Sequence, residues 1–246
     1  MIADLVKPTV SVPTVYHEEV ALQFARAGVP TLIEKPLAHS LDSGKRIRQA
    51  FDETRTFVAV GQVERFNPAV RELKARLDQG FLGEIFQIST SRQSSFPHRI
   101  ADVGVVADLA THDLDLTMYL SSSEYEQVSG FTSHKAHRQH EDLLVMSGRL
   151  RNGVLVNHVV NWMSPRKERL TTIIGERGVL VADTLAADLT YYENGGFKVD
   201  WEARAGFRGI SEGNSISYAF DRVEPLKSEL IEFTLALDEG DQGRLA

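Results

Sequence analysis

The hydrophobic pattern of the chain changes once, near residue 84, and this change constrains the fold more than any other feature of the sequence. Before it, short apolar runs alternate with stretches whose apolar residues recur every three or four positions. After it, apolar and polar residues alternate one by one along several segments, as in strands with one buried face. The sequence therefore predicts an α/β part followed by a mostly antiparallel α+β part.

The first part, placed at residues 1–63, is expected to form a parallel sheet with covering helices. The expected strands are residues 9–12, 29–33 and 57–60, and the expected helices are residues 15–27, capped by Thr14, and 41–53, capped by Ser40. Three short strands are too few for a whole doubly wound domain. We therefore expect a partial Rossmann-like sheet.

The second part, placed at residues 64–246, is expected to be a mostly antiparallel sheet with three helices. The expected strands are residues 85–92, 126–133, 142–150, 154–162, 169–175 and 179–182, and the expected helices start at Pro68 and span residues 105–120 and 225–238. Arg151-Asn152-Gly153 has the composition of a hairpin turn between two of these strands.

Glu34-Lys35-Pro36 follows the second expected strand directly. Because proline disfavours the helical conformation of the preceding residue, the chain should leave the sheet edge at Lys35 in an extended conformation. This predicts a strand that delivers Lys35 to a cleft. An ordinary surface Lys-Pro turn is the alternative for this run taken alone.

Asp108, His112 and Asp115 lie on one expected helix. Residues three and four apart share a helix face, so the three side chains are predicted to form one polar stripe. A carboxylate one turn from an imidazole can fix its tautomer and raise its basicity, as a general base acting on a hydroxyl requires. A solvated helix face is the alternative that the spacing leaves open.

His134, His137 and His140, with Asp142 close behind, have a spacing that metal ligands can adopt. However, they fall between two expected strands and beside Lys135 and Arg138, whose charges would repel a divalent cation. We interpret the segment as an exposed turn and expect no metal site.

Composition and missing motifs narrow the classes of function. A net charge of -7 argues against a nucleic-acid surface, and the absence of cysteine excludes disulfides and thiolate metal sites. No run approaches about 18 apolar residues, and there is no secretory leader, so we expect a cytoplasmic protein without a membrane span. Phosphate-loop and Gly-x-Ser-x-Gly motifs are missing, so the sequence gives no support for a nucleoside triphosphatase or a serine hydrolase.

Taken in order, these motifs resemble the glucose-fructose oxidoreductase/inositol dehydrogenase (Gfo/Idh/MocA) family over nearly the whole chain. The resemblance rests on Glu34-Lys35-Pro36 and on the Asp-x-x-x-His-Asp-x-Asp pattern from Asp108 to Asp115. Val12-Pro13-Thr14 with His17 resembles the segment beside the nicotinamide ribose. The stretch from Gly61 to Pro68 resembles the crossover into the substrate domain.

The resemblance implies an oxidoreductase that moves a hydride between a nicotinamide cofactor, NAD or alternatively NADP, and a secondary alcohol of a sugar, nucleotide sugar or inositol. It implies that His112 accepts the hydroxyl proton, that Asp108 orients His112 and that Lys35 polarises the oxygen. The implied cofactor-contacting residues are Pro13, Thr14, His17, Glu34, Lys35 and Gln62. The implied substrate-contacting residues are Arg65, Arg92, Arg99 and Asp115.

The stretch from Phe96 to Val105 is most similar to the branch that acts on UDP-N-acetylglucosamine. Arg92 and Arg99 could then face the diphosphate, because a guanidinium fork suits phosphate oxygens, and a surface salt bridge is the alternative for either side chain. Inositols and free sugars remain open as substrates. The resemblance also implies a homodimer or homotetramer formed through the antiparallel sheet.

The chain departs from the family at both ends. The glycine-rich phosphate loop and the acidic ribose residue have no counterpart, so about 70 residues of a doubly wound half-domain are expected to precede Met1, and a closing helix is expected to follow Ala246. We expect an enzyme whose first strands lie outside this sequence. A non-catalytic module that binds sugar or cofactor, and a fragment that only oligomerises, are the alternatives.

Overall fold

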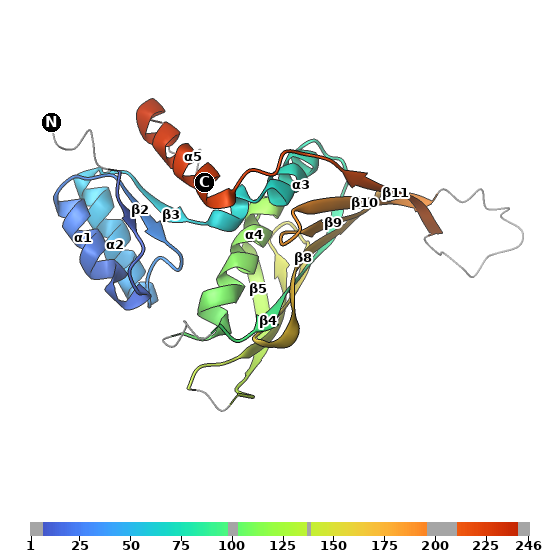
Figure 1. The fold of residues 1–246 in the computed structure, drawn as a ribbon, viewed down its shortest axis with the longest axis horizontal. Helices are drawn as coiled ribbons and strands as arrows, with labels where there is room; N and C mark the ends of the chain where they lie inside the picture. Colours follow the sequence, from blue (N-terminus) through green and yellow to red (C-terminus); the bar gives the residue numbers. More distant parts are fainter. Residues whose placement is uncertain (1–6, 98–102, 137–138, 196–210, 241–246) are drawn as a thin grey trace, which may run out of the picture. The chain divides into compact units, whose positions relative to one another are not determined.

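The computed structural model describes residues 7–97, 103–136, 139–195 and 211–240 (Figure 1). The chain divides into two compact units, Met1–Phe66 with Val223–Ala246, and Asn67–Arg222. The sequence analysis assigned the C-terminal helix to the second part. In the structure it belongs to the first unit, because its Phe233 packs against Leu32 and Ala59 of that unit's sheet.

The first unit is a three-stranded parallel sheet between helices, with the strand order β1-β2-β3. Its elements are β1 (Thr9–Val10), η1 (Thr14–Tyr16), α1 (His17–Arg26), β2 (Thr31–Glu34), α2 (Leu41–Thr54), β3 (Val58–Gly61), η2 (Val63–Phe66) and α5 (Pro225–Glu239). This confirms the expected partial Rossmann-like sheet.

Alternation along β2 explains why both faces of this sheet are covered. Ile33 packs with residues of α1 and α2, whereas its neighbour Leu32 points to the other face and packs with Phe233 of α5. Both side chains are fully buried. The apolar centre of this short strand is therefore buried on both sides, as expected for a parallel sheet with two covered faces.

The helix starts of this unit were predicted with mixed success. Ser40 caps α2, because its Oγ accepts a hydrogen bond of 3.2 Å from the Ser43 N–H. Glu224 caps α5 in the same way, through the N–H groups of Leu226 and Lys227. The predicted cap at Thr14 is wrong: Thr14 begins a 3-10 turn, and α1 starts three residues later.

The second unit is an eight-stranded sheet in the order β11-β10-β9-β8-β4-β7-β6-β5. Its elements are α3 (Pro68–Asp78), β4 (Ile85–Ser95), η3 (Val106–Ala110), α4 (Thr111–Ser121), β5 (Tyr125–Ser133), β6 (Leu143–Leu150), β7 (Leu155–Asn161), β8 (Met163–Gly175), β9 (Gly178–Asp183), β10 (Asp188–Gly195) and β11 (Ser211–Tyr218). Among the described strands of this sheet, only the β4–β7 pair is parallel. The mostly antiparallel sheet is thus confirmed.

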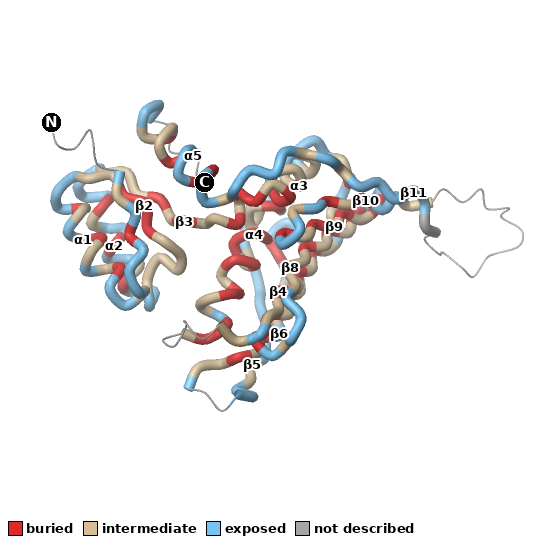
Figure 2. The backbone as a smooth tube through the Cα atoms, in the orientation of Figure 1, coloured by how far each residue is buried: buried red, intermediate tan, exposed pale blue. Residues whose placement is uncertain are grey.

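Helices α3 and α4 cover one face of this sheet, and the main core lies between. Leu73 of α3 and Leu116 of α4 are buried against alternate residues of the strands, among them Ile88 and Ile173. Figure 2 shows the buried backbone of α4 and of the strands. The predicted hairpin turn joins β6 to β7, with Gly153 at φ +90°, a conformation that glycine adopts without strain.

The sequence analysis missed β10 and β11. Both strands are mostly polar, and β11 has Ile216 as its one aliphatic side chain. They pair with each other at the end of the sheet, where less apolar surface is needed than in central strands. No helix of the described residues is long and apolar enough to cross a membrane.

Candidate functional site

The first unit gathers several expected cofactor residues at one edge of its sheet. Because the three strands are parallel, the segments that follow them emerge at the same edge. Pro13 and Thr14 follow β1, Lys35 follows β2, and Gln62 follows β3. Ligands of open α/β sheets bind at this carboxyl edge. The strand predicted before Lys35 is present and Lys35 is half-buried, while its delivery to a cleft stays a prediction.

His17 ties two of these segments together. Its side chain is fully buried, with Nε2 2.9 Å from the carbonyl oxygen of Val12 and Nδ1 3.1 Å from that of Pro36. Both ring nitrogens are thus directed at backbone carbonyls. In the structure His17 links the segments before and after Lys35, and the cofactor contact that the resemblance implied for it stays a prediction.

Gln62 has a buried polar atom that lacks a partner. Its Oε1 is inaccessible to solvent and accepts no hydrogen bond from the described residues. An unpaired buried acceptor costs about 1–3 kcal/mol, and such an atom is explained when a ligand donates to it. Gln62 is therefore the best supported of the expected cofactor-contacting residues.

Glu34 turns its carboxylate toward the neighbouring strand. The carboxylate lies over Gly61, where an added Cβ would be 3.2 Å from Oε2. Burial is the largest influence and raises the pKa of Glu34, while the backbone hydrogen bond at Lys35 lowers it. Glu229 of α5, fully buried, repels Glu34, and burial with this repulsion raises the pKa of Glu229 to about 7.

In the second unit, the helix that carries His112 begins with a π-helical segment. The expected helix at residues 105–120 is present, but η3 is π-helical and only α4 is α-helical. A π-helix closes i→i+5 hydrogen bonds and has more residues per turn than an α-helix. His112 and Asp115 share a face of α4, whereas the alignment of Asp108 in η3 with His112 stays a prediction.

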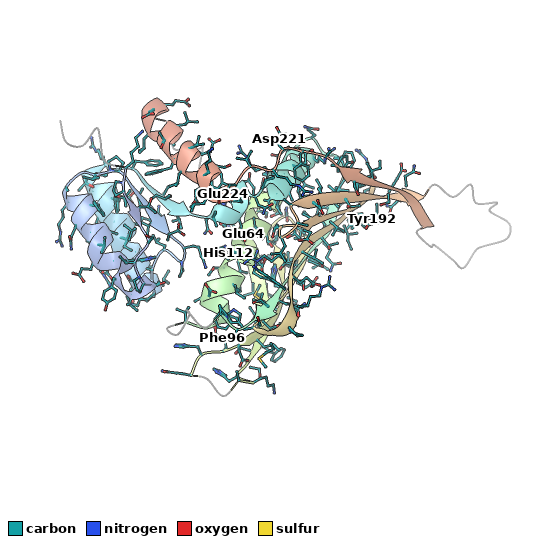
Figure 3. The ribbon with its side chains drawn as sticks, in the orientation of Figure 1. Glu64, Phe96, His112, Tyr192, Asp221 and Glu224 are labelled. Carbon is teal, nitrogen blue, oxygen red and sulfur yellow. The ribbon has the colours of Figure 1, made fainter. Side chains whose placement is uncertain are left out.

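His112 and Asp115 are buried, at 8% and 6% exposure, so a solvated helix face is excluded (Figure 3). Asp108 is half-buried. Segments of π-helix are frequent at functional sites, where they re-aim side chains. His112 thus lies in the protein interior, two residues after the end of the π-helical segment.

The environment of Arg92 fits neither the diphosphate contact nor the surface salt bridge that the sequence suggested. Its Nε donates to the carboxylate of Asp113, at 3.1 Å from Oδ1 and 3.2 Å from Oδ2, and the two side chains are 4% and 2% exposed. This is a buried ion pair, neither a surface salt bridge nor a group open to a substrate diphosphate. Arg65 is half-buried in η2 of the first unit, and Arg99 lies outside the described residues.

The acidic residues after the histidine segment bind backbone groups. The Asp142 carboxylate accepts hydrogen bonds from the N–H groups of Lys135 (2.9 Å) and Ala136 (2.5 Å). The Glu141 carboxylate accepts one of 3.0 Å from Val106 at the start of η3. Asp142 is buried, so the carboxylate that binds the backbone of this turn lies in the protein interior. His137 lies outside the described residues.

Asp113, Tyr125 and His158 were not recognised as site residues from the sequence. A signal existed for Asp113: it shares a face at i, i+3 and i+7 with Leu116 and Leu120, so it had to face the core. A buried carboxylate needs a cation nearby, and Arg92 is that cation. No comparable signal marks Tyr125 and His158, which meet only through strand register.

Comparison with known proteins identifies the class. The family described as "Oxidoreductase family, NAD-binding Rossmann fold" matches residues 5–62, and that described as "GFO/IDH/MocA C-terminal domain" matches residues 70–181. The chain belongs to the Gfo/Idh/MocA family of NAD(P)-dependent oxidoreductases.

The relatives include enzymes with different substrates. Inositol 2-dehydrogenase 2 of Saccharopolyspora erythraea is 32% identical over 146 residues, which cover 57% of this chain and 43% of the relative. UDP-N-acetylglucosamine 3-dehydrogenase of Acidithiobacillus ferrooxidans is 27% identical over 195 residues, 79% of this chain and 61% of the relative. The match therefore spans less than two thirds of the length of either relative.

Solved structures give the same picture. The A. ferrooxidans enzyme superposes with a TM-score of 0.80 at 25% identity and covers 98% of this chain and 75% of that one. The WlbA dehydrogenase of Bordetella pertussis, in complex with NADH and UDP-GlcNAcA, superposes with a TM-score of 0.67 at 25% identity, covering 74% and 62%.

Proposed function

We propose that the chain carries the catalytic residues of an NAD(P)-dependent dehydrogenase that oxidises a secondary alcohol of a nucleotide sugar. The observation that carries the proposal is that both halves of the family match in order and each retains its reactive side chain. Lys35 directly follows β2 in the first unit, and His112 is the second residue of α4 in the second.

The residues of the first unit fit the nicotinamide end of the cofactor. Gln62 Oε1 can accept a hydrogen bond from an amide or a ribose hydroxyl, and Pro13, Thr14 and Lys35 follow strands at the same sheet edge. When bound, a nicotinamide takes up the hydride that leaves the carbinol carbon. The 246 residues contain no glycine-rich loop, so no residue is proposed for the pyrophosphate.

Residues of this chain are proposed to accept the hydroxyl proton of the substrate and to stabilise the oxygen that becomes the carbonyl. His112 accepts the hydroxyl proton as the C–H bond breaks and the C=O bond forms, because a neutral imidazole is a base near neutral pH. Lys35 donates a hydrogen bond to the same oxygen and stabilises the negative charge that develops on it. Asp108 is proposed to orient His112, in a geometry set by the π-helical segment.

The nucleotide-sugar class is supported by the extent of the likeness. The A. ferrooxidans enzyme matches over 195 residues, against 146 for the inositol dehydrogenase of S. erythraea. Arg65 and Asp115 are proposed as substrate-contacting residues. Association through the sheet face opposite to α3 and α4 is proposed as well, because Phe131 and Leu155 on that face are 80% and 57% exposed.

The test is turnover with NAD⁺, followed by absorbance of the reduced cofactor, with UDP-N-acetylglucosamine and myo-inositol as substrates. We expect oxidation of the nucleotide sugar and a loss of at least about 100-fold in His112→Ala and in Lys35→Ala. His134→Ala, a change at an exposed histidine, is the matched control and should retain activity. Full turnover in either catalytic variant contradicts the assignment, and preference for myo-inositol contradicts the substrate class.

A further inference from the structure

A buried polar circuit joins α4 to three strands of the second unit. It begins at Thr90 on β4, whose Oγ1 lies 2.7 Å from Nδ1 of His158 on β7. Nε2 of His158 lies 2.8 Å from the Tyr125 hydroxyl at the start of β5. Burial raises the pKa of the Tyr125 phenol, and Thr117 on α4 lies near enough to Tyr125 for its hydroxyl to lower it.

The circuit continues along α4 and returns to the strand where it started. The Thr117 hydroxyl donates to the Asp113 carbonyl at 2.8 Å, and the Asp113 carboxylate accepts the Arg92 Nε. Thr90 and Arg92 are two residues apart on β4 and share its inner face. Thr90, Arg92, Asp113, Thr117 and His158 are all at most 3% exposed.

His158 bonds to two hydroxyl groups, one through each ring nitrogen. A neutral imidazole donates from one nitrogen and accepts at the other, so one of the two bonds is donated by His158 and the other by a hydroxyl group. Such an arrangement requires a neutral ring, and burial lowers the pKa of His158 to about 4.

The circuit makes contact with α4 at two points one helical turn apart. Asp113 and Thr117 are separated by four residues, so they fix both the rotation of the helix about its axis and its position along β4. His112 is the residue next to Asp113, and a hydrophobic interface alone permits more rotation than directed hydrogen bonds do. The ion pair therefore acts on the direction in which the imidazole points.

We propose that Asp113 and Arg92 are positioning residues for His112, and that the circuit through Thr117, Tyr125 and His158 holds the catalytic helix in one orientation. This inference rests on the proposed role of His112. It assigns no contact with substrate or cofactor to any member of the circuit.

The experiment compares His112 in variants of the full chain. Removing one charge would leave the other buried and could unfold the unit, so the main variant is Arg92→Met with Asp113→Leu, which replaces the pair by apolar side chains. A second pair is Thr117→Val, which removes the hydroxyl, and Thr117→Ser, which keeps it. Leu180→Ala, a core truncation on β9, is the control for destabilisation without loss of the circuit.

The first readout is the imidazole NMR signal of His112, assigned by its loss in His112→Ala. We expect a shifted or broadened signal in the double variant and in Thr117→Val, and a native signal in Thr117→Ser and Leu180→Ala. The second readout is the split between kcat and KM. A misdirected base should lower kcat about 10- to 100-fold with KM within about twofold.

The two proposals fail separately. Retained turnover in His112→Ala would remove the catalytic role of His112 while the NMR comparison still tests the circuit. A native His112 signal in the folded double variant would overturn the positioning role, whatever the activity is. A signal changed equally in Leu180→Ala would overturn it too, since general loosening would then explain the effect.

Discussion

Glu229 on α5 and Glu34 at the end of β2 are two carboxylates of one unit that repel each other, and Glu229 is fully buried. Burial and this repulsion raise the pKa of Glu229 to about 7 from an ordinary value of 4.5. The folded unit therefore binds a proton that the unfolded chain releases between these two values. Its stability is complete below pH 4.5 and declines as the pH rises through about 7.

Glu229→Gln should remove this dependence, because an amide resembles the neutral carboxyl group. We expect the variant to exceed the parent chain in stability by about 2 kcal/mol above pH 7 and to match it at pH 5. Hydrogen exchange of β2 and β3, corrected for intrinsic rates, measures the difference. Glu19→Gln, an exposed change on α1, is the control and should show the parent pH dependence.

His158 gives the second unit the opposite pH dependence. Burial lowers its pKa from 6.5 to about 4, so the unfolded chain binds the extra proton in this range. Stability is complete above pH 6.5 and falls by about 3 kcal/mol as the pH drops to 4. Trp162 is buried in the second unit, so a change in its emission during urea titration reports the unfolding of that unit.

The control for this prediction is the exposed His134, whose change to Gln should leave the curve as it is. His158→Gln should flatten the curve between pH 6.5 and 4, at a cost in stability at neutral pH because the circuit is interrupted. An unchanged slope in His158→Gln would show that another group titrates.

Gly104→Ala should disturb the start of the helix that carries His112. A Cβ at this position would overlap the Glu141 carboxylate, which accepts the Val106 N–H of η3. We expect a loss of about 1–3 kcal/mol in urea unfolding followed by tryptophan emission, as for other overpacked sites. Gly44→Ala in α2, where the nearest atom is 3.8 Å away, should instead leave the protein as stable or slightly more stable.

Phe233→Ala tests whether α5 is part of the first unit. The Phe233 ring is 1% exposed and stacks on Phe57 at a centroid distance of 5.9 Å. Its removal should cost about 3–5 kcal/mol and increase hydrogen exchange in β2 and β3. Leu230→Ala on the exposed side of α5 is the control and should stay within about 0.5 kcal/mol. Unchanged exchange in Phe233→Ala would separate α5 from this sheet.

The sequence predicted the elements that local pattern determines. The buried strand β2, the proline shortly after it and the cap at Ser40 are consequences of neighbouring residues, and all three are present. The contacts of the site depend on strand register and could not be predicted locally. His158 on β7 reaches Tyr125 on β5 across the intervening strand β6. Arg92 on β4 meets Asp113 on α4, across the interface between the sheet and the helix.

The π-helical segment is a further feature that local pattern does not reveal. The sequence from Val106 to Ala110 has no marked helix breaker, and the N–H of Val106 binds the Glu141 carboxylate of a turn distant in the sequence. For the same reason α5 was assigned to the wrong part: its amphipathic pattern shows a buried face, but not which sheet that face covers.

The central claim is that the first unit binds a nicotinamide dinucleotide at the edge that contains Lys35 and Gln62. Calorimetric titration of the 246-residue chain with NADH tests it most directly, with Gln62→Ala and the exposed change Glu19→Gln measured alongside. We predict binding by the parent chain and by Glu19→Gln, weakened about tenfold in Gln62→Ala, because one buried hydrogen bond is lost. A folded chain that releases no heat with NADH, or equal affinity in all three proteins, would contradict this account.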